Sequence, residues 1–257
     1  MKSEYHHANK ELWEAGATRW GEMADSRELW RRCPSEPGLV LCDRELEYLG
    51  DIAGKRVCVL GSGDNQVVFA LAGLGGVVTS VDVSRNQLDI ARQRSKEIGL
   101  SVEFVQADVT DLSVFEKGRF DIVYTGGHVA VWVADLRAYY REAGRVLARR
   151  GLFLVDEYHP FRRIWQESGE RLVVKSSYFD RGPHEQHVTA DILEPAPGRF
   201  TCYKFHWTVA DYIGAVMEAG FRLLLVHEYG EEYGDWEGAP MEGLPEFLLI
   251  VARKETE

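Results

Sequence analysis

The feature that most constrains this chain is a regular alternation of short apolar runs with helical segments between residues 56 and 156. Continuous apolar runs are typical of strands that are buried on both faces of a parallel sheet. Repeated strand–helix units form a doubly wound sheet, because right-handed crossovers place helices on both of its faces. The predicted strands are Arg56–Leu60, Val77–Val81, Val102–Val105, Phe120–Tyr124 and Leu152–Asp156.

Capping residues and glycines mark the ends of the intervening helices. Ser84 begins a capping box with Gln87, and Gly99 ends the helix that follows. Asp135 is placed to cap a further helix that runs to about Arg149. These signals support helices where the crossovers of a parallel sheet require them.

The alternation stops at residue 160 and resumes after residue 206. The intervening segment contains four prolines and two strand-like pieces, Leu172–Tyr178 and Cys202–Trp207, and its polar stretch around residues 184–187 is expected to be a loop. We therefore predict an insertion at residues 160–206, near the carboxyl edge of the sheet. A helix at Thr208–Ala219 and strands at Phe221–His227 and Phe247–Val251 complete an α/β fold of seven strands.

Residues 1–53 are polar and helical in character and lack the alternation of a sheet strand. Gly16, Gly21 and the segment Pro34–Gly38 are expected to break this segment into pieces. We predict two parts, an N-terminal helical cap or lid at residues 1–53 and a main domain at residues 54–257.

The formal net charge of −11 disfavours a nucleic-acid substrate, because an acidic surface repels phosphate backbones. The four cysteines form no CxxC pair, which favours reduced thiols. No HxH or HxxxH spacing predicts a metal site. No signal-peptide pattern and no apolar stretch of ~18 residues is present, so we expect a cytoplasmic protein without membrane spans.

The first chemical signal is a glycine turn after the first predicted strand, at Gly61, Ser62, Gly63 and Asp64. Glycines there allow the backbone to approach a ligand closely. A dinucleotide fingerprint requires a third glycine where this chain has Gln66, and the lysine of a P-loop is also absent. Asp64 would repel phosphate and attract an ammonium or sulfonium group. The turn therefore favours a charged ligand that is not a phosphate.

Two carboxylates follow the next two strands in order. Asp82 ends the second strand, where an acidic side chain accepts the hydroxyls of a ribose. Asp108 lies just beyond the third strand, within reach of the exocyclic amine of an adenine. Together with the glycine turn, these residues predict a site for adenosine that carries a charged tail.

The glycine turn, Asp82, the run Gln106-Ala107-Asp108-Val109 and the strand at Phe120–Tyr124 resemble the class I S-adenosylmethionine-dependent methyltransferases, small-molecule branch. The resemblance covers roughly residues 50–160 and resumes at 207–253. It implies a sheet with an antiparallel last strand, and S-adenosyl-L-methionine as cofactor. One departure is Asn65, where many members of the family have a third glycine.

The resemblance also implies roles for residues of this chain. The glycine turn would hold the methionine end of the cofactor, Asp82 its ribose and Asp108 its adenine, with Val109 against the base. The implied cofactor-binding residues are Gly61, Ser62, Gly63, Asp64, Asp82, Val83, Gln87, Asp108, Val109, Thr125 and Gly126.

Residues that act on the methyl acceptor are expected at the carboxyl ends of the strands, beside the glycine turn. Histidine suits proton removal near neutral pH, so His128, His159 and His206 are candidate catalytic residues, with Tyr178 as a fourth. For each, a purely structural role is an open alternative: His128 can orient a turn, and Tyr178 can pack in a strand.

The chain is rich in aromatic residues, with seven tryptophans and eleven tyrosines. Ordinary core packing accounts for most of them, but several fall where a lid is expected. We expect Trp20, Tyr158, Trp207 and Trp236 to bind the acceptor, because aromatic walls suit a flat or cationic molecule. The predicted acceptor is an aromatic or heterocyclic small molecule, with resemblance to enzymes of secondary metabolism that act on indoles or cyclic dipeptides.

Two other functions are open at this point. A nicotinamide-dependent oxidoreductase shares the sheet, although Asp64 and Gln66 argue against it. A non-catalytic S-adenosylmethionine-binding protein would share the donor site without needing an acceptor.

Overall fold

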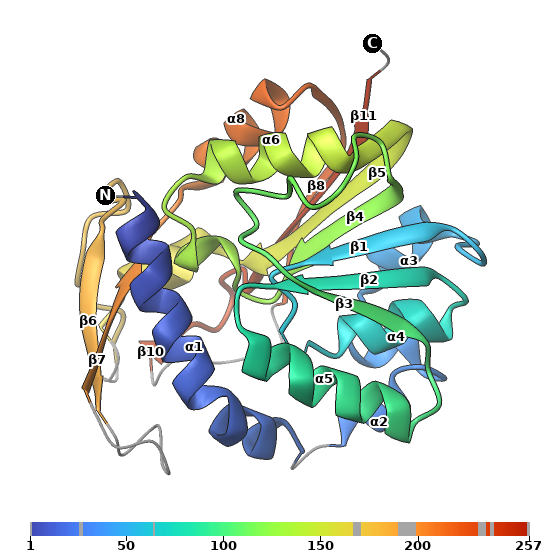
Figure 1. The fold of residues 1–257 in the computed structure, drawn as a ribbon. Helices are drawn as coiled ribbons and strands as arrows, with labels where there is room; N and C mark the ends of the chain where they lie inside the picture. The colour runs from blue at the N-terminus through green and yellow to red at the C-terminus, as the bar shows by residue number, and fades with distance from the viewer. Residues whose placement is uncertain are drawn as a thin grey trace.

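The computed structural model describes residues 2–25, 28–63, 65–166, 171–189, 199–230, 235–236 and 239–255. These residues form an α/β fold on a seven-stranded sheet with strand order β3-β2-β1-β4-β5-β11-β8 (Figure 1). The strands of this sheet are β1 (Arg56–Leu60), β2 (Val77–Asp82), β3 (Val102–Gln106), β4 (Phe120–Gly126), β5 (Leu147–Tyr158), β8 (Phe221–Tyr229) and β11 (Phe247–Lys254).

The pairing directions confirm the predicted sheet. The strands from β1 to β5 pair in parallel, whereas β11 runs antiparallel to both β5 and β8. The apolar runs are continuous because both faces are covered. Val57 and Val59 of β1 pack into the core on one side of the sheet, and Cys58 and Leu60 pack into the core on the other.

Helices cover both faces of the sheet, with α6 and α8 on one side and α4 and α5 on the other (Figure 1). The described α-helices are α1 (Lys2–Asp25), α2 (Leu29–Arg32), α3 (Asp43–Leu49), α4 (Val67–Gly73), α5 (Arg85–Glu97), α6 (Leu136–Val146) and α8 (Val209–Glu218). The short 3-10 helices are η1 (Pro37–Leu39), η2 (Ala130–Trp132) and η3 (Pro160–Ile164).

The predicted caps of α5 and α6 are confirmed. The Ser84 hydroxyl accepts a hydrogen bond from the Gln87 backbone N–H, and the Asp135 carboxylate accepts one from Ala138. The predicted end of α6 at Arg149 is wrong, because the chain turns into β5 at Leu147 and leaves Arg149 on that strand.

The predicted breaks at Gly16 and Gly21 are wrong, since α1 runs through both glycines. The predicted break at Pro34–Gly38 is confirmed, because α2 ends at Arg32 and α3 begins only at Asp43. A side chain at position 21 would lie 3.4 Å from the Ile90 side chain of α5. The Arg94 guanidinium donates a hydrogen bond of 2.8 Å to the Gly21 carbonyl. The glycine therefore allows close packing of α1 on α5 and does not end the helix.

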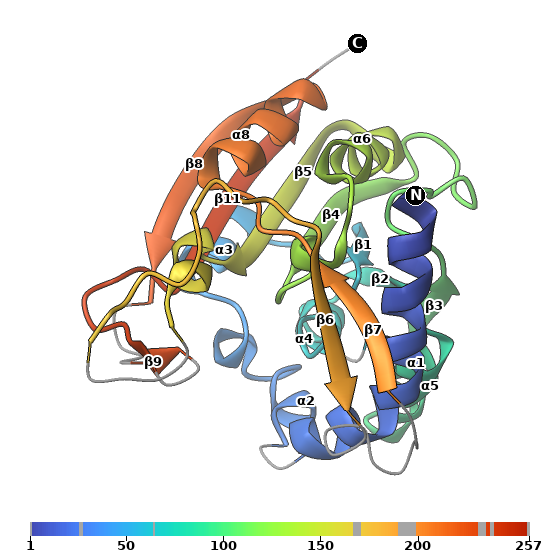
Figure 2. The ribbon, with the colours of Figure 1, turned by 90° about the vertical axis from the view of Figure 1, so that its left-hand side faces the viewer.

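The insertion contains a two-stranded hairpin of β6 (His184–Thr189) and β7 (Arg199–Lys204), which lies beside α1 (Figure 2). The expected polar loop around residues 184–187 is thus a strand, because its backbone pairs with β7. The predicted strand at Leu172–Tyr178 is wrong. Val174 forms one isolated bridge with Trp165, and its side chain is 63% exposed.

Two short strands, β9 (Asp235–Trp236) and β10 (Ala239–Pro240), pair in the segment between β8 and β11. Within the described ranges, we find no helix that combines the length and apolar character needed to span a bilayer. The four cysteines are free thiols.

Candidate active site

A cavity of about 540 Å³ opens at the carboxyl ends of the parallel strands, against α1. Its volume lies in the range of roughly 300–1,000 Å³ that is usual for small-molecule sites. The described residues that line it are His6, Asn9, Trp13, Trp20, Gly61, Ser62, Gly63, Asn65, Gln66, Asp82, Val83, Gln87, Asp108, Val109, Gly127, His128, Val129, Trp132, Val133 and Tyr158.

The glycine turn forms one wall of this cavity. Gly61 has φ +64° and Gly63 has φ +47°, a left-handed conformation that other residues adopt at a cost. A Cβ atom at position 61 would lie 2.3 Å from the Cγ1 atom of Val129. The turn therefore requires glycine both for its conformation and for its contact with the loop after β4.

Asp82 is held beside the turn by two backbone donors. The Gly63 N–H donates to its Oδ2 atom at 2.8 Å, and the Ser84 N–H donates to its Oδ1 atom at 2.7 Å. Asp82 also lines the cavity, so its carboxylate lies beside any ligand that binds against the turn.

Gln87 supplies an acceptor with no partner among the described residues. Its side chain is buried and lines the cavity, and its Oε1 atom makes no hydrogen bond there. A buried acceptor without a partner costs stability, which a ligand N–H or O–H group would offset on binding. The Ser62 hydroxyl, in contrast, bonds to Ser80 at 2.7 Å within the turn.

Asp108 accepts hydrogen bonds on both carboxylate oxygens. Thr110 donates to Oδ1 from its backbone N–H at 2.8 Å and from its hydroxyl at 2.7 Å. His6 of α1 lies 2.6 Å from Oδ2 through its Nδ1 atom. Burial is the largest single influence and raises the pKa of Asp108, but His6 and the two Thr110 hydrogen bonds together outweigh it, so the net shift is downward.

These residues fit an adenosine with a charged tail better than a dinucleotide. Two carboxylates and an unpartnered amide oxygen face the cavity, and none of the described lining residues is a lysine or an arginine. A pyrophosphate would therefore meet negative charge without a cation to compensate it. Asp64, which completes the predicted turn, lies outside the described residues.

Five aromatic side chains form an unbroken run along the cavity wall. Trp20 packs on Trp13 at 4.3 Å between ring centroids, and Trp13 packs on Trp132 at 5.2 Å. The run continues from Trp132 to His128 at 6.1 Å and ends at Tyr158, 5.1 Å from His128. The wall therefore presents flat apolar faces beside the glycine turn.

His128 is a strained, half-buried residue in the loop after β4. Its backbone has φ +84°, which costs a residue with a side chain roughly 1–3 kcal/mol. Burial of the ring lowers the pKa of His128 well below its ordinary range, and the charges of Arg163 and Lys204 act in the same direction. The ring is therefore neutral near physiological pH, and its surroundings disfavour the protonated form.

Glu157 of β5 anchors the loop after β4, which carries His128. Its Oε1 atom accepts hydrogen bonds from the backbone N–H groups of Val129 at 3.1 Å and Ala130 at 2.9 Å. The side chain is 1% exposed, and burial raises the pKa of Glu157 to about 7 although those donors oppose the shift. Since Val129 also contacts Gly61, Glu157 connects the loop of His128 to the glycine turn.

Several predicted site residues lie away from the cavity. His159 pairs with Glu228 at 2.7 Å, and His206 stacks on His184 with ring centroids 4.0 Å apart. Burial, together with His184, lowers the pKa of His206 to about 3. Neither His159 nor His206 is among the lining residues.

Other predicted residues have structural contacts of their own. The Tyr178 hydroxyl accepts a hydrogen bond from Val209 at 3.0 Å, at the start of α8. The Trp207 indole donates to the Ala130 carbonyl at 3.0 Å, and the Thr125 hydroxyl bonds to Tyr139 in the core.

Two further predicted residues are placed only through their backbone. The Gly126 carbonyl accepts a bond from Asn65 at 3.4 Å. Trp236 forms part of β9, but its side chain lies outside the described residues.

The expected lid contributes Trp20 to the cavity, as predicted, together with Trp13, but the sequence prediction missed two polar residues of α1. His6 and Asn9 line the cavity, and no motif marks a polar residue of an N-terminal helix as part of a site between distant strands. Val129 and Trp132 were also missed. They follow the predicted fourth strand directly, so the expectation that strand ends form the site could have been extended to them.

Comparison with known proteins identifies the family of this chain. Residues 58–155 match the family described as methyltransferase domain. A ubiquinone biosynthesis O-methyltransferase of Xanthomonas euvesicatoria is 31% identical over 198 residues, which cover 76% of this chain and 77% of that protein. An uncharacterized methyltransferase of Bacillus subtilis, YbaJ, is 29% identical over 180 residues, covering 68% and 69% of the two chains.

Solved structures share the fold at lower identity. An S-adenosylmethionine-dependent methyltransferase from Mesorhizobium loti aligns with a TM-score of 0.60 and 21% identity, covering 81% of this chain and 94% of that one. A structure described as a putative S-adenosylmethionine-dependent methyltransferase, from Listeria monocytogenes, aligns with a TM-score of 0.61 and 22% identity, covering 83% and 97%. With the family match and the sequence relatives, this chain belongs to the class I S-adenosylmethionine-dependent methyltransferases.

Proposed function

We propose that this enzyme transfers a methyl group from S-adenosylmethionine to an oxygen, nitrogen or carbon atom of an aromatic or heterocyclic small molecule, a class that includes indoles and cyclic dipeptides. The observation that carries the proposal is the continuous aromatic wall from Trp20 to Tyr158 beside the glycine turn. Flat rings bury a flat acceptor efficiently, and their faces attract a sulfonium by cation–π interaction.

The donor roles follow the order of the strand ends. When bound, S-adenosylmethionine supplies an electrophilic methyl group. Gly61 and Gly63 let the backbone approach its methionine end, while Asp82 accepts the ribose hydroxyls and Asp108 accepts the adenine amine. Gln87 uses its unpartnered Oε1 atom to accept a further hydrogen bond from the ligand.

Oxygen is the favoured acceptor atom within this proposal. The Xanthomonas relative is named as an O-methyltransferase in ubiquinone biosynthesis. A hydroxyl nucleophile must lose its proton, and the ring of His128 lines the cavity where an acceptor would lie. His128 is accordingly the proposed proton acceptor, and Tyr158 and Trp132 are the proposed neighbours of the acceptor ring.

The test is methyl transfer from isotopically labelled S-adenosylmethionine to a panel of catechols, indoles and cyclic dipeptides, with a cell extract as a further acceptor source. Mass spectrometry should find labelled methyl in an aromatic product. If the protein binds S-adenosylhomocysteine but labels no acceptor in the panel or the extract, the non-catalytic alternative is correct.

Once an acceptor is known, His128→Ala should lower kcat by at least roughly tenfold when the acceptor is a hydroxyl. His187→Ala is the matched control, because His187 lies on β6 with a side chain that is 40% exposed. Unchanged kcat in His128→Ala would assign the proton to another acceptor.

A further inference from the structure

His6 of α1 joins two separate parts of the donor site. Its Nδ1 atom lies 2.6 Å from the Oδ2 atom of Asp108, and its Nε2 atom accepts a hydrogen bond of 2.9 Å from the Ala134 backbone N–H. The side chain is 12% exposed, and both His6 and Asp108 line the cavity. Among the described residues, His6 is the one that forms a hydrogen bond with the Oδ2 atom of Asp108.

The two contacts of His6 determine where its proton resides. Since the backbone N–H of Ala134 can only donate, Nε2 must be the acceptor. The proton of the neutral ring is then on Nδ1, from which it is donated to the Asp108 carboxylate. The Ala134 N–H therefore orients the His6 ring, and the ring in turn orients the Asp108 carboxylate.

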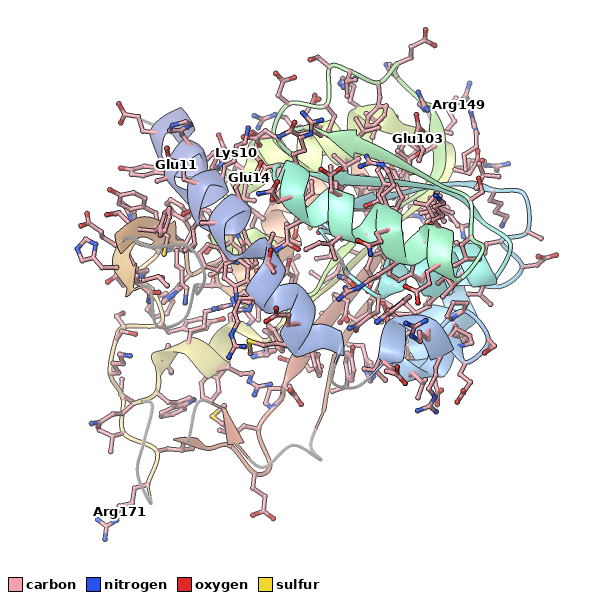
Figure 3. All side chains as sticks on the ribbon, turned by 60° about the horizontal axis from the view of Figure 1, so that its bottom comes forward. Lys10, Glu11, Glu14, Glu103, Arg149 and Arg171 are labelled. Carbon is pink, nitrogen blue, oxygen red and sulfur yellow. The ribbon has the colours of Figure 1, made fainter. Side chains whose placement is uncertain are left out.

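Other residues of α1 fix the position of the helix, and therefore of His6. The Asn9 side chain donates to the carbonyls of Trp132 at 3.0 Å and Tyr203 at 2.9 Å, and it accepts a bond from the Tyr203 N–H at 2.8 Å. Glu14 lies between α1 and α5 (Figure 3), and its carboxylate accepts backbone bonds from Arg85 and Asn86 at 2.9 Å each. The helix is thus anchored on both sides of the cavity.

We propose that His6 is a positioning residue of the cofactor site, which fixes the Asp108 carboxylate so that a free lone pair of Oδ2 receives the 6-amino group of adenine. The inference rests on the proposed role of Asp108. Thr110 holds Oδ1 and His6 holds Oδ2, so the carboxylate has one orientation before the ligand arrives. A carboxylate fixed in this way loses less entropy on binding than a mobile one.

Two substitutions separate the two contacts of the ring. In His6→Asn the amide nitrogen can take the place of Nδ1 and keep the hydrogen bond to Asp108. In His6→Gln the longer amide can take the place of Nε2, which keeps the contact to Ala134 and loses the one to Asp108. His7→Ala is the matched control, since the neighbouring His7 side chain is 73% exposed and pairs with Glu11 of the same helix.

The measurement is the Kd, by calorimetry, of S-adenosylhomocysteine and of its analogue with hydrogen in place of the 6-amino group. The wild type should prefer the amino compound. In His6→Gln this preference should fall about tenfold, the loss of one hydrogen bond to a charged group, while His6→Asn and His7→Ala should retain it. Circular dichroism of each variant establishes that it is folded.

Three results would overturn the role of His6. Equal losses for both ligands in His6→Gln would mean that His6 only supports α1. Unchanged affinities would mean that Asp108 needs no orientation, and tighter binding would mean that His6 competes with adenine. A wild type that binds neither compound would instead contradict the proposed function, so the two failures are distinguishable.

Discussion

Gly61 meets two separate requirements, one of conformation and one of space. Its φ of +64° disfavours a side chain, and a Cβ atom would lie 2.3 Å from Val129. Gly61→Ala should therefore displace the loop after β4 and weaken S-adenosylhomocysteine binding at least roughly tenfold, measured by calorimetry. Gly38→Ala is the control, because nothing lies within 4 Å of a Cβ atom there. Equal affinity in the two variants would show that the turn tolerates a side chain.

Glu157 should make stability depend on pH. Its pKa in the folded protein is about 7, raised from an ordinary 4.5 by burial. Between these values the folded protein keeps a proton that the unfolded chain has released, so the free energy of unfolding falls as pH rises. Relative to Glu157→Gln, the wild type should lose on the order of 3 kcal/mol between pH 4 and 8.

Urea unfolding of both proteins across that range measures this difference. Parallel pH profiles would mean that Glu157 ionises normally in the folded state. The comparison with glutamine matters because Glu45 and Asp156 have pKa values shifted in the same direction. The substitution removes the contribution of Glu157 together with the small part of the Asp156 shift that the Glu157 charge causes.

The residues at strand ends could be predicted because sequence order fixes their position. Gly61, Asp82 and Asp108 each follow a parallel strand, and such ends meet at one edge of a sheet. His6 and Asn9 could not be predicted, because they reach the site through the tertiary packing of α1. The separation of 102 residues between His6 and Asp108 leaves no local pattern.

At the scale of elements, α1 and α5 depend on one another through Glu14. Its carboxylate accepts hydrogen bonds from the first backbone N–H groups of α5 and from the Ser84 hydroxyl, as a capping residue does. Glu14→Ala should lower the free energy of unfolding by about 1 kcal/mol. Hydrogen exchange in the first turn of α5 should also become faster.

Denaturant unfolding and hydrogen exchange measure these two effects, with Glu11→Ala as the control. Glu11 lies one turn earlier on α1, is 60% exposed and pairs with His7 on the same helix. If both variants lose the same stability, the contact between α1 and α5 does not depend on the capping carboxylate.

Elements with local signals could be predicted, whereas those defined by a partner could not. The cap at Ser84 and the apolar run of β1 were sufficient to place their elements. Gly16 and Gly21 do not end α1, because tertiary contacts such as the hydrogen bond from Arg94 to the Gly21 carbonyl support the helix. Strand β6 was missed because its polar sequence becomes a strand only by pairing with β7.

At the scale of the whole molecule, the cavity has walls from both α1 and the sheet. S-adenosylhomocysteine at 100 times its Kd should stabilise the folded protein by about 2.7 kcal/mol. Hydrogen exchange should slow in α1 as well as at the carboxyl ends of β1 and β2. Slowing confined to the strand ends would mean that α1 takes no part in binding.

The contact between Asn9 and Tyr203 joins residues 194 positions apart. Because β7 follows α1 by most of the length of this sequence, the place of α1 beside β7 does not exist until synthesis has passed Lys204. Until then Leu12 lacks its packing against Cys202. The anchoring of α1 at this side of the cavity can thus be completed only after β7 has been synthesised.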